Sequence, residues 1–275
     1  MPGQSSPVAD TTERLARVAN IERGMAILEA IVGLPHGLTV GELALQLRLP
    51  KSAVSRILAT LQSEGYVARD PLSNRFRIAL KLISMVLRHV DRLGIDDLCL
   101  PLMRSVAEET RELVQLALVD GEEMRFVAKA DGPHRIRAVS LMGTKVETHS
   151  MAAGKVWLAS LPRSHALKLA LADGLERHTK TTIATIEDLG RELDMVGERG
   201  FAMNLGEYAE GVHSIAAPIR SQRMGGAVLG AAVLTGPDFR LSEERLTELA
   251  PALERLGVEL GEILPADLVK LPFTT

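Results

Sequence analysis

Cysteine is almost absent from this chain of 275 residues, which contains one, Cys99. A single cysteine cannot form an intrachain disulfide, and it cannot supply the several thiolates of a cysteine-built zinc site. Cys99 lies among Leu98, Leu100 and Leu102. We therefore expect a buried thiol in a hydrophobic core.

Long apolar runs are also missing. No stretch approaches the roughly 20 residues that span a bilayer, and the N-terminal sequence MPGQSSPVADTTERL lacks the apolar core of a signal peptide. We therefore expect a cytoplasmic protein without a membrane partner. With 46% hydrophobic and 24% charged residues, the chain is long enough to bury two ordinary cores.

Excess positive charge is confined to the first third of the chain. Residues 1–93 carry 12 Lys and Arg against 8 Asp and Glu, a net charge of +4, and the remainder carries 20 against 27, a net charge of −7. A modest basic patch in an acidic protein suits a DNA-binding protein that must also dissociate, because phosphate neutralisation sets affinity and its salt dependence. A solvated charged face is the alternative. The basic excess lies mainly in Arg48, Lys51, Arg56, Arg69, Arg75 and Arg77.

Residues 38–77 follow the order of a winged helix-turn-helix, with two short amphipathic helices, a turn, a third helix and a basic hairpin. In the third helix, apolar residues recur at the i, i+3, i+4, i+7 spacing of a buried stripe: Val54, Ile57, Leu58 and Leu61. The other face carries Lys51, Ser52, Ser55, Arg56 and Ala59. Short side chains permit close approach to the major groove, and Lys and Arg reach phosphates or base edges. This pattern predicts a helix that reads DNA.

Residues with special backbone chemistry mark the ends of these elements. Thr39 and Glu42 have the spacing of a capping box, Pro50 suits a helix start, and Gly65 suits a helix end. Turn formers join two short strands over residues 66–69 and 76–78 into a wing tipped by Asn74 and Arg75. The predicted DNA contacts are Thr39, Lys51, Ser52, Ser55, Arg56, Arg69, Asn74, Arg75 and Arg77.

The remaining pattern predicts five segments: a disordered tail over residues 1–18, a winged helix domain over 19–79, a linker helix over 80–94, a second domain over 95–264 and a C-terminal tail over 265–275. The apolar side of the linker helix suits a dimer contact or packing on its own domain. After residue 95, helices and strands alternate, including a strand expected at residues 136–140. Strands with helices packed on them indicate an α+β sensor-type domain.

Six segments carry a resemblance to a known family: IERGMAILEAI, LTVGELALQLRLPKSAVSRILATLQSEGYV, RFRIALKL, HSMAAGKVWLASLP, ERGFAMNLGEYAEGVHSIAAPI and LTGPDFRLSEERLTELAPAL. In order and spacing the chain resembles the IclR family of bacterial transcription regulators over about residues 20–264. The resemblance implies a winged helix-turn-helix, a linker helix and a GAF-like effector-binding domain with an antiparallel sheet. It also implies a homodimer or homotetramer that binds double-stranded DNA at an inverted-repeat operator.

The same resemblance implies an effector pocket lined by Met142, Met151, Ala152, Ala153, Asn204, Ser214, Val233 and Thr235. The chain departs from the family where Met151 replaces a small polar residue, Asn204 an acidic one, and His213-Ser214 an Arg-Cys pair. Ala53 and Ser55 likewise replace the usual Thr and His in the reading helix. These departures suggest a retuned pocket and a different operator.

A small organic acid is the effector that these residues favour. The amides of Ala152 and Ala153 lie at a predicted helix N-terminus, where unpaired N–H groups attract an anion. Asn204 in place of a carboxylate removes a repulsion against that anion. Alternatively, Met142 and Met151 are ordinary core residues.

Three function classes remain open in the sequence. The favoured one is an effector-responsive DNA-binding regulator of a catabolic or metabolic operon, without enzymatic activity. A winged-helix adaptor acting through protein contacts is the second. A hydrolase using Ser150, His149 and Glu207 is the third, but no nucleophile elbow, Walker loop or dinucleotide fingerprint supports it. The histidines have no compact ligand spacing, so neither a metal site nor a cofactor is expected.

Overall fold

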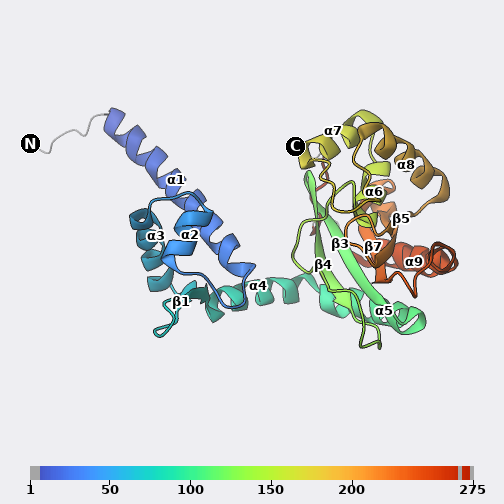
Figure 1. Cartoon of the computed structure of the whole chain (residues 1–275), viewed down its shortest axis with the longest axis horizontal. Coiled ribbons are helices and arrows are strands. Elements are labelled where there is room, and N and C mark those ends of the chain that lie inside the picture. The colour runs from blue at the N-terminus through green and yellow to red at the C-terminus, as the bar shows by residue number, and fades with distance from the viewer. Residues whose placement is uncertain (1–6, 266–267, 273–275) are drawn as a thin grey trace, which may run out of the picture. The chain divides into compact units, whose positions relative to one another are not determined.

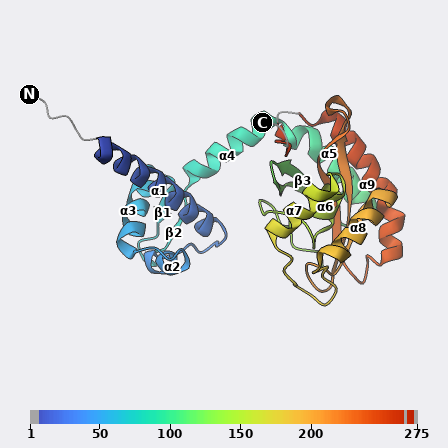
Figure 2. The same cartoon turned by 90° about the horizontal axis from the view of Figure 1, so that it is seen from above.

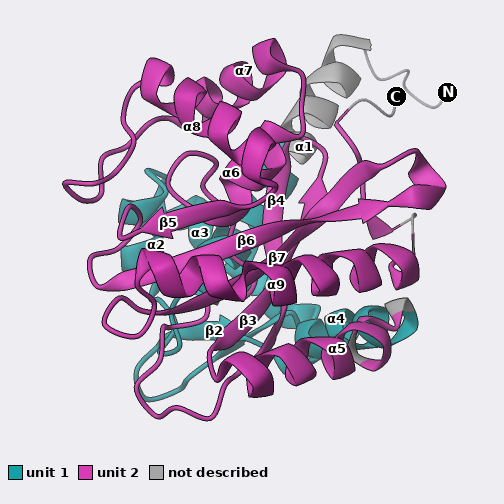
Figure 3. Cartoon of the chain, turned by 90° about the vertical axis from the view of Figure 1, so that its right-hand side faces the viewer, with its two compact units in different colours: residues 1–92 teal, residues 93–275 magenta. Residues whose placement is uncertain are grey.

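The computed structural model describes residues 7–265 and 268–272, and they form two compact units, Met1–Arg92 and Leu93–Thr275 (Figures 1 and 3). Each unit has a hydrophobic core of its own. None of the helices in the described ranges is long and apolar enough to cross a membrane.

The first unit is a winged helix-turn-helix. Its elements are α1 (Pro7–Val32), α2 (Val40–Gln46), α3 (Lys51–Ser63), β1 (Val67–Arg69), β2 (Phe76–Ile78) and α4 (Leu80–Leu93). Strands β1 and β2 pair antiparallel, and Leu38 adds a bridge to Phe76. The core residues Ile27, Leu43 and Leu58 are fully buried, so α1, α2 and α3 share one small core.

Capping fixes the start of α2. The Thr39 side chain accepts a hydrogen bond from the Glu42 amide at 3.2 Å, and the Glu42 carboxylate accepts one from the Thr39 amide at 2.7 Å. This confirms the predicted capping box, which satisfies two N–H groups that the first turn leaves without helical partners.

The N-terminal segment differs from its prediction. Residues 7–18, expected as part of a disordered tail, form the first turns of α1. Pro7 begins the helix, where the missing amide proton costs nothing, and good helix formers such as Ala, Leu, Arg and Glu follow. Residues 1–6 of that tail lie outside the described residues.

The second unit is a five-stranded antiparallel sheet in the order β4-β3-β7-β6-β5. Its strands are β3 (Leu113–Asp120), β4 (Glu123–Ala130), β5 (Ala202–Leu205), β6 (Val212–Ser221) and β7 (Ala227–Pro237). Its helices are α5 (Ile95–Thr110), α6 (Ala152–Ala159), α7 (Arg163–Asp173), α8 (Ile186–Arg199), the short 3-10 helix η1 (Gln222–Met224) and α9 (Glu243–Ile263). The winged helix followed by an antiparallel sheet with helices confirms the α+β class.

Helices cover both faces of this sheet (Figures 2 and 3). Helices α5 and α9 pack together against one face, while α6 packs against β5, β6 and β7 on the other, with α7 and α8 outside it. Strand β3 is buried along nearly its whole length, as expected for an inner strand with both faces covered. Cys99 of α5 is fully buried, as predicted.

One other prediction for this unit is wrong, and another is made more specific. Residues 136–140 form no strand, because their backbone joins none of the described sheets; Ile136 and Val139 are exposed. The described part of the predicted C-terminal tail docks on the second unit. Lys270 forms a β-bridge with Asp120 at the end of β3, and the Gly121 amide donates a hydrogen bond to the Lys270 carbonyl at 2.6 Å. Val269 is buried. Residues 266–267 and 273–275 of that tail lie outside the described residues.

Candidate functional site

Helix α3 presents the surface that the sequence predicted. Val54 and Leu58 are buried, whereas Lys51, Ser52, Ser55, Arg56 and Ala59 are exposed on the other side of the helix. Within the described part of the chain, neither Lys51 nor Arg56 has an ion pair. Their charges are therefore available to a polyanion.

The basic residues of the wing are held by neighbours. Arg75 reaches back to α2, where its guanidinium donates to both Glu42 carboxylate oxygens at 2.8 and 3.1 Å and to the Gly37 carbonyl at 2.8 Å. Arg77 pairs with Asp70 at 2.9 Å. This side chain therefore joins the wing to the start of α2, while its predicted contact with DNA stays a prediction.

The wing tip is ordered by a further local contact. Asn74 has a positive φ of 56°, a conformation that asparagine tolerates better than most residues. Its side-chain oxygen accepts a hydrogen bond from Arg69 at 2.6 Å. The side chains of Asn74 and of the capping residue Thr39 both form local hydrogen bonds. The predicted DNA contacts that remain exposed on α3 are Lys51, Ser52, Ser55 and Arg56.

A cavity of about 240 Å³ lies between α6 and the sheet in the second unit. Sheet register explains how distant residues meet there. Asn204, Ser214 and Thr235 are cross-strand partners on β5, β6 and β7, and Val233 is opposite Gln115 of β3. Since alternate residues of a strand share a face, these side chains line one wall.

The structure brings together seven of the eight residues predicted to line a pocket. These are Met151, Ala152, Ala153, Asn204, Ser214, Val233 and Thr235. Met142 is the exception, because it is 42% exposed and does not line the cavity. Its neighbour Leu141 takes that place instead. The lining residues that the sequence did not indicate are Gln115, Phe126, Ala138, Val139, Leu141, Tyr208, Ala209 and Val212.

Unused hydrogen-bond donors face this cavity. The Nε2 atom of Gln115, a residue only 2% exposed, has no hydrogen-bond partner among the described residues. The Asn204 side-chain oxygen accepts the Glu207 amide at 2.7 Å, which leaves the Asn204 NH₂ group as a donor. Helix α6 starts at Ala152 without a side-chain cap, and its first amides have no helical acceptor. The wall is therefore rich in donors and suits a ligand with several acceptor oxygens.

A buried ion-pair network supports α6 from behind. The Lys155 ammonium lies 2.7 Å from Glu207 and 3.4 Å from Glu192, which also binds Arg199 at 2.8 Å. The Lys155 side chain is 1% exposed. Burial raises the pKa of Glu207, although the charge of Lys155 opposes this effect. The network joins α6 to α8 and to the segment after β5.

The residues proposed for a hydrolase do not form a catalytic group. Ser150 donates to Glu147 at 2.7 Å, a ring nitrogen of His149 contacts the Glu176 carbonyl at 2.9 Å, and Glu207 pairs with Lys155. The members of a catalytic triad hydrogen-bond to one another, whereas these three side chains are directed to other partners.

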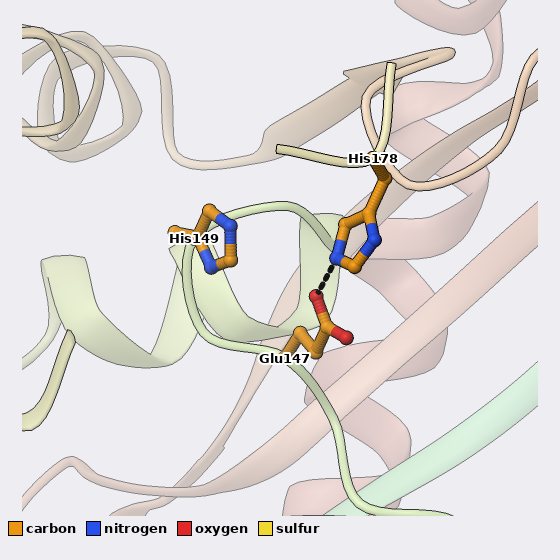
Figure 4. A group of neighbouring side chains, drawn as sticks. All are labelled: Glu147, His149 and His178. Carbon is orange, nitrogen blue, oxygen red and sulfur yellow. Dashed lines mark hydrogen bonds and ion pairs between the residues drawn. The ribbon is translucent and has the colours of Figure 1, made fainter. Parts of the chain in front are cut away.

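His178 lies close to His149 and Glu147 (Figure 4). Its Nε2 atom is 2.6 Å from a Glu147 carboxylate oxygen, and its ring stacks on His149 with centroids 6.2 Å apart. His178 follows Glu147 by 31 positions and His149 by 29 in the sequence, so residue spacing could not reveal this cluster. It arises because the segment between α7 and α8 returns to the start of α6.

Comparisons with known proteins agree with this geometry. The IclR helix-turn-helix domain matches residues 20–71, and the C-terminal domain of bacterial transcriptional regulator IclR matches residues 87–260. The HTH-type transcriptional regulator KdgR of Escherichia coli is 30% identical over 260 residues, which cover 92% of this chain and 97% of KdgR.

Two solved structures share the fold. The IclR of Thermotoga maritima has a TM-score of 0.68 and 27% identity, covering 89% of this chain and 98% of its own. An IclR homologue of Microbacterium hydrocarbonoxydans in complex with 4-hydroxybenzoate has a TM-score of 0.72 and 23% identity, covering 88% and 98%. With a winged helix that exposes a basic reading face and family matches over both units, this chain belongs to the IclR family of bacterial transcriptional regulators.

Proposed function

We propose that this regulator binds an inverted-repeat operator as a homo-oligomer and releases or engages it in response to a small organic acid in the cavity beside α6. Control of a catabolic or metabolic operon fits such a ligand. The observation that carries the proposal is the group of hydrogen-bond donors, among them Gln115 and the first amides of α6, that line the cavity. DNA is the partner of α3, because Lys51 and Arg56 form no ion pair with any residue that the structure describes.

The short length of the recognition helix α3 favours a dimer as the unit that binds DNA. One recognition helix covers only a short half-site, so two-fold pairing is the usual way to read a longer site. Exposed apolar side chains on α4, such as Ile83, Val86 and Leu87, provide a surface for such pairing. This supports a dimer as the unit that binds DNA.

The size and chemistry of the cavity support a small acid. At about 240 Å³ it falls below the roughly 300–1,000 Å³ of pockets that hold drug-sized ligands. The described residues that line it include no Asp, Glu, Lys, Arg or His, so a carboxylate would be held by the amides of Ala152 and Ala153 and by Gln115 and Asn204. Amides at a helix N-terminus combine donors with the positive end of the helix dipole. The apolar walls would contact the rest of the ligand.

The proposal predicts a specific loss of effector affinity in Asn204→Asp. The new carboxylate keeps the oxygen that accepts the Glu207 amide, but it adds a negative charge at the cavity wall. We expect the affinity for an acidic effector to fall at least tenfold, since ~1.4 kcal/mol of repulsion suffices for that change and the charge is largely desolvated. A thermal-shift screen of small carboxylic acids, 4-hydroxybenzoate included, would first supply the ligand, and calorimetric titration would then compare the proteins.

Two further variants control this experiment. Ala152→Leu should block the same cavity by volume and give a protein that binds its operator without responding to the acid. Met142→Asp adds the same charge to an exposed side chain outside the cavity and should leave effector affinity unchanged. Equal affinity in wild type, Asn204→Asp and Ala152→Leu would place the effector elsewhere. Loss of operator binding in the last two would show that they disturb the whole protein.

A further inference from the structure

Three side chains outside the cavity lining form a compact set of potential metal ligands. Glu147 and His149 lie just before α6, and His178 lies in the segment between α7 and α8 (Figure 4). One ligand atom from each residue lies within 4.8 Å of the others. Close packing supports this position of Glu147, because a Cβ atom on Gly154 of α6 would come within 2.4 Å of the Glu147 carbonyl oxygen.

The hydrogen bonding of His149 leaves a buried lone pair. Its Nε2 atom lies 2.9 Å from the Glu176 carbonyl oxygen; since that oxygen only accepts, Nε2 carries the proton. In the neutral ring Nδ1 then bears a lone pair. Nδ1 is buried and has no hydrogen-bond partner among the described residues, and His149 is only 2% exposed. An unpartnered buried acceptor is costly in stability, and therefore indicates a missing partner.

This arrangement matches the surroundings of a metal-binding histidine. Such histidines usually donate their second ring N–H to a carbonyl or carboxylate, which fixes the tautomer and directs the free lone pair to the ion. Here the Glu176 carbonyl does this for His149. The Ser150 hydroxyl, which donates to Glu147 Oε2 at 2.7 Å, orients the carboxylate in a similar way.

The contact between Glu147 and His178 is one that a cation could replace. Glu147 Oε2 and His178 Nε2 are 2.6 Å apart, within hydrogen-bond distance. Tyr208 packs edge-on against the His178 ring, with centroids 5.4 Å apart. The side chains of His178 and Glu147 remain 22% and 32% exposed, so an ion has a path from solvent.

We propose that Glu147, His149 and His178 bind one divalent transition-metal ion of the zinc type. Two imidazoles and a carboxylate suit zinc and its neighbours, whereas magnesium and calcium prefer oxygen ligands alone. Three protein ligands leave a fourth tetrahedral position open. Bonds of about 2.0–2.2 Å to zinc require the partly exposed His178 side chain to rotate toward the other two. The sequence predicted no metal site because the histidines lack compact ligand spacing. The fold brings His178 next to Glu147 and His149, and this proposal therefore replaces that prediction.

Calorimetry on the full chain without an affinity tag tests this site. Protein stripped with a chelator should take up one Zn²⁺ per chain and gain thermal stability by mass action, and Mg²⁺ should give neither effect. Glu147→Gln and His178→Ala should each reduce zinc affinity at least tenfold, since even supporting residues of metal sites are worth about 10–100-fold. His36→Ala removes an exposed histidine of the first unit and should bind zinc as wild type does.

His178→Gln separates a lost ligand from a lost fold. Glutamine can keep a hydrogen bond to Glu147 but is a poor zinc ligand, so this variant should match the melting temperature of metal-free wild type and fail to gain stability with Zn²⁺. Zinc binding by His178→Gln and His178→Ala at wild-type affinity would overturn the proposal. So would the absence of zinc binding by the stripped wild-type protein.

Discussion

Lys155→Met should lower the free energy of unfolding by about 3–5 kcal/mol at pH 7, the usual cost of removing one partner from a buried ion pair. Methionine fills a similar volume but leaves Glu207 without its cation at 2.7 Å and Glu192 without its second. The second Glu207 oxygen already lacks a partner in the described structure. Denaturant unfolding followed by circular dichroism measures this change.

The pH dependence of that loss has a defined sign. Burial already raises the pKa of Glu207 in the folded protein despite the opposing charge of Lys155, and removing Lys155 must raise it further. A carboxyl group with a raised folded pKa adds stability below its unfolded pKa and loses it as pH rises through the folded value. The defect should therefore shrink as pH falls from 7 toward the ordinary carboxyl range. Lys168→Met changes an exposed lysine on α7 and should behave as wild type; an equal loss there, or none in Lys155→Met, would contradict this role of the network.

Arg56→Ala should weaken binding to the operator by about 1–3 kcal/mol, roughly 5–150-fold, if Arg56 reads a base edge. The side chain lies on the exposed face of α3 and has no ion pair within the described residues, so its removal should disturb the protein little. Lys51→Ala should instead weaken binding to all sequences about equally and reduce the salt dependence by about one phosphate contact. Fluorescence titrations of operator and scrambled duplexes at several salt concentrations distinguish the two effects.

An arginine outside the first unit provides the control. Arg191→Ala on α8 removes the same charge from an exposed side chain and should leave both titrations unchanged. Unaltered operator affinity in Arg56→Ala would remove this residue from the reading surface. An equal loss on operator and scrambled DNA would make Arg56 a phosphate contact.

The first unit could be predicted from sequence because its signals are local. The apolar stripe of α3, the Thr39–Glu42 capping box and the linker helix α4 each depend on residues a few positions apart, and all appear in the structure. The contact between the wing and α2 was missed because the pairing of Arg75 with Glu42 spans 33 residues. A basic residue in a hairpin gives no indication of which carboxylate it will meet.

In the second unit, the resemblance to the IclR family indicated seven of the residues that line the cavity. The periodicity of apolar residues indicated only where the strands of this unit lie. Gln115 was overlooked because a polar residue in an apolar strand has no local signal of facing a cavity; only its register opposite Val233 places it there. The prediction of a strand at residues 136–140 was wrong, because alternating apolar and polar residues do not by themselves provide a neighbouring strand for hydrogen bonding. The cluster of Glu147, His149 and His178 depends entirely on the return of a loop.

Selection from a library of random duplexes by the full chain tests the central claim most directly, because the operator sequence need not be known. If two copies of α3 read DNA together, the enriched sequences should contain an inverted repeat whose half-site centres lie about one helical turn, 10–10.5 base pairs, or slightly more apart. The Arg56→Ala protein should enrich the repeat poorly or relax one position within each half. Absence of any enriched sequence, or enrichment of a single unrepeated half-site, would contradict the account.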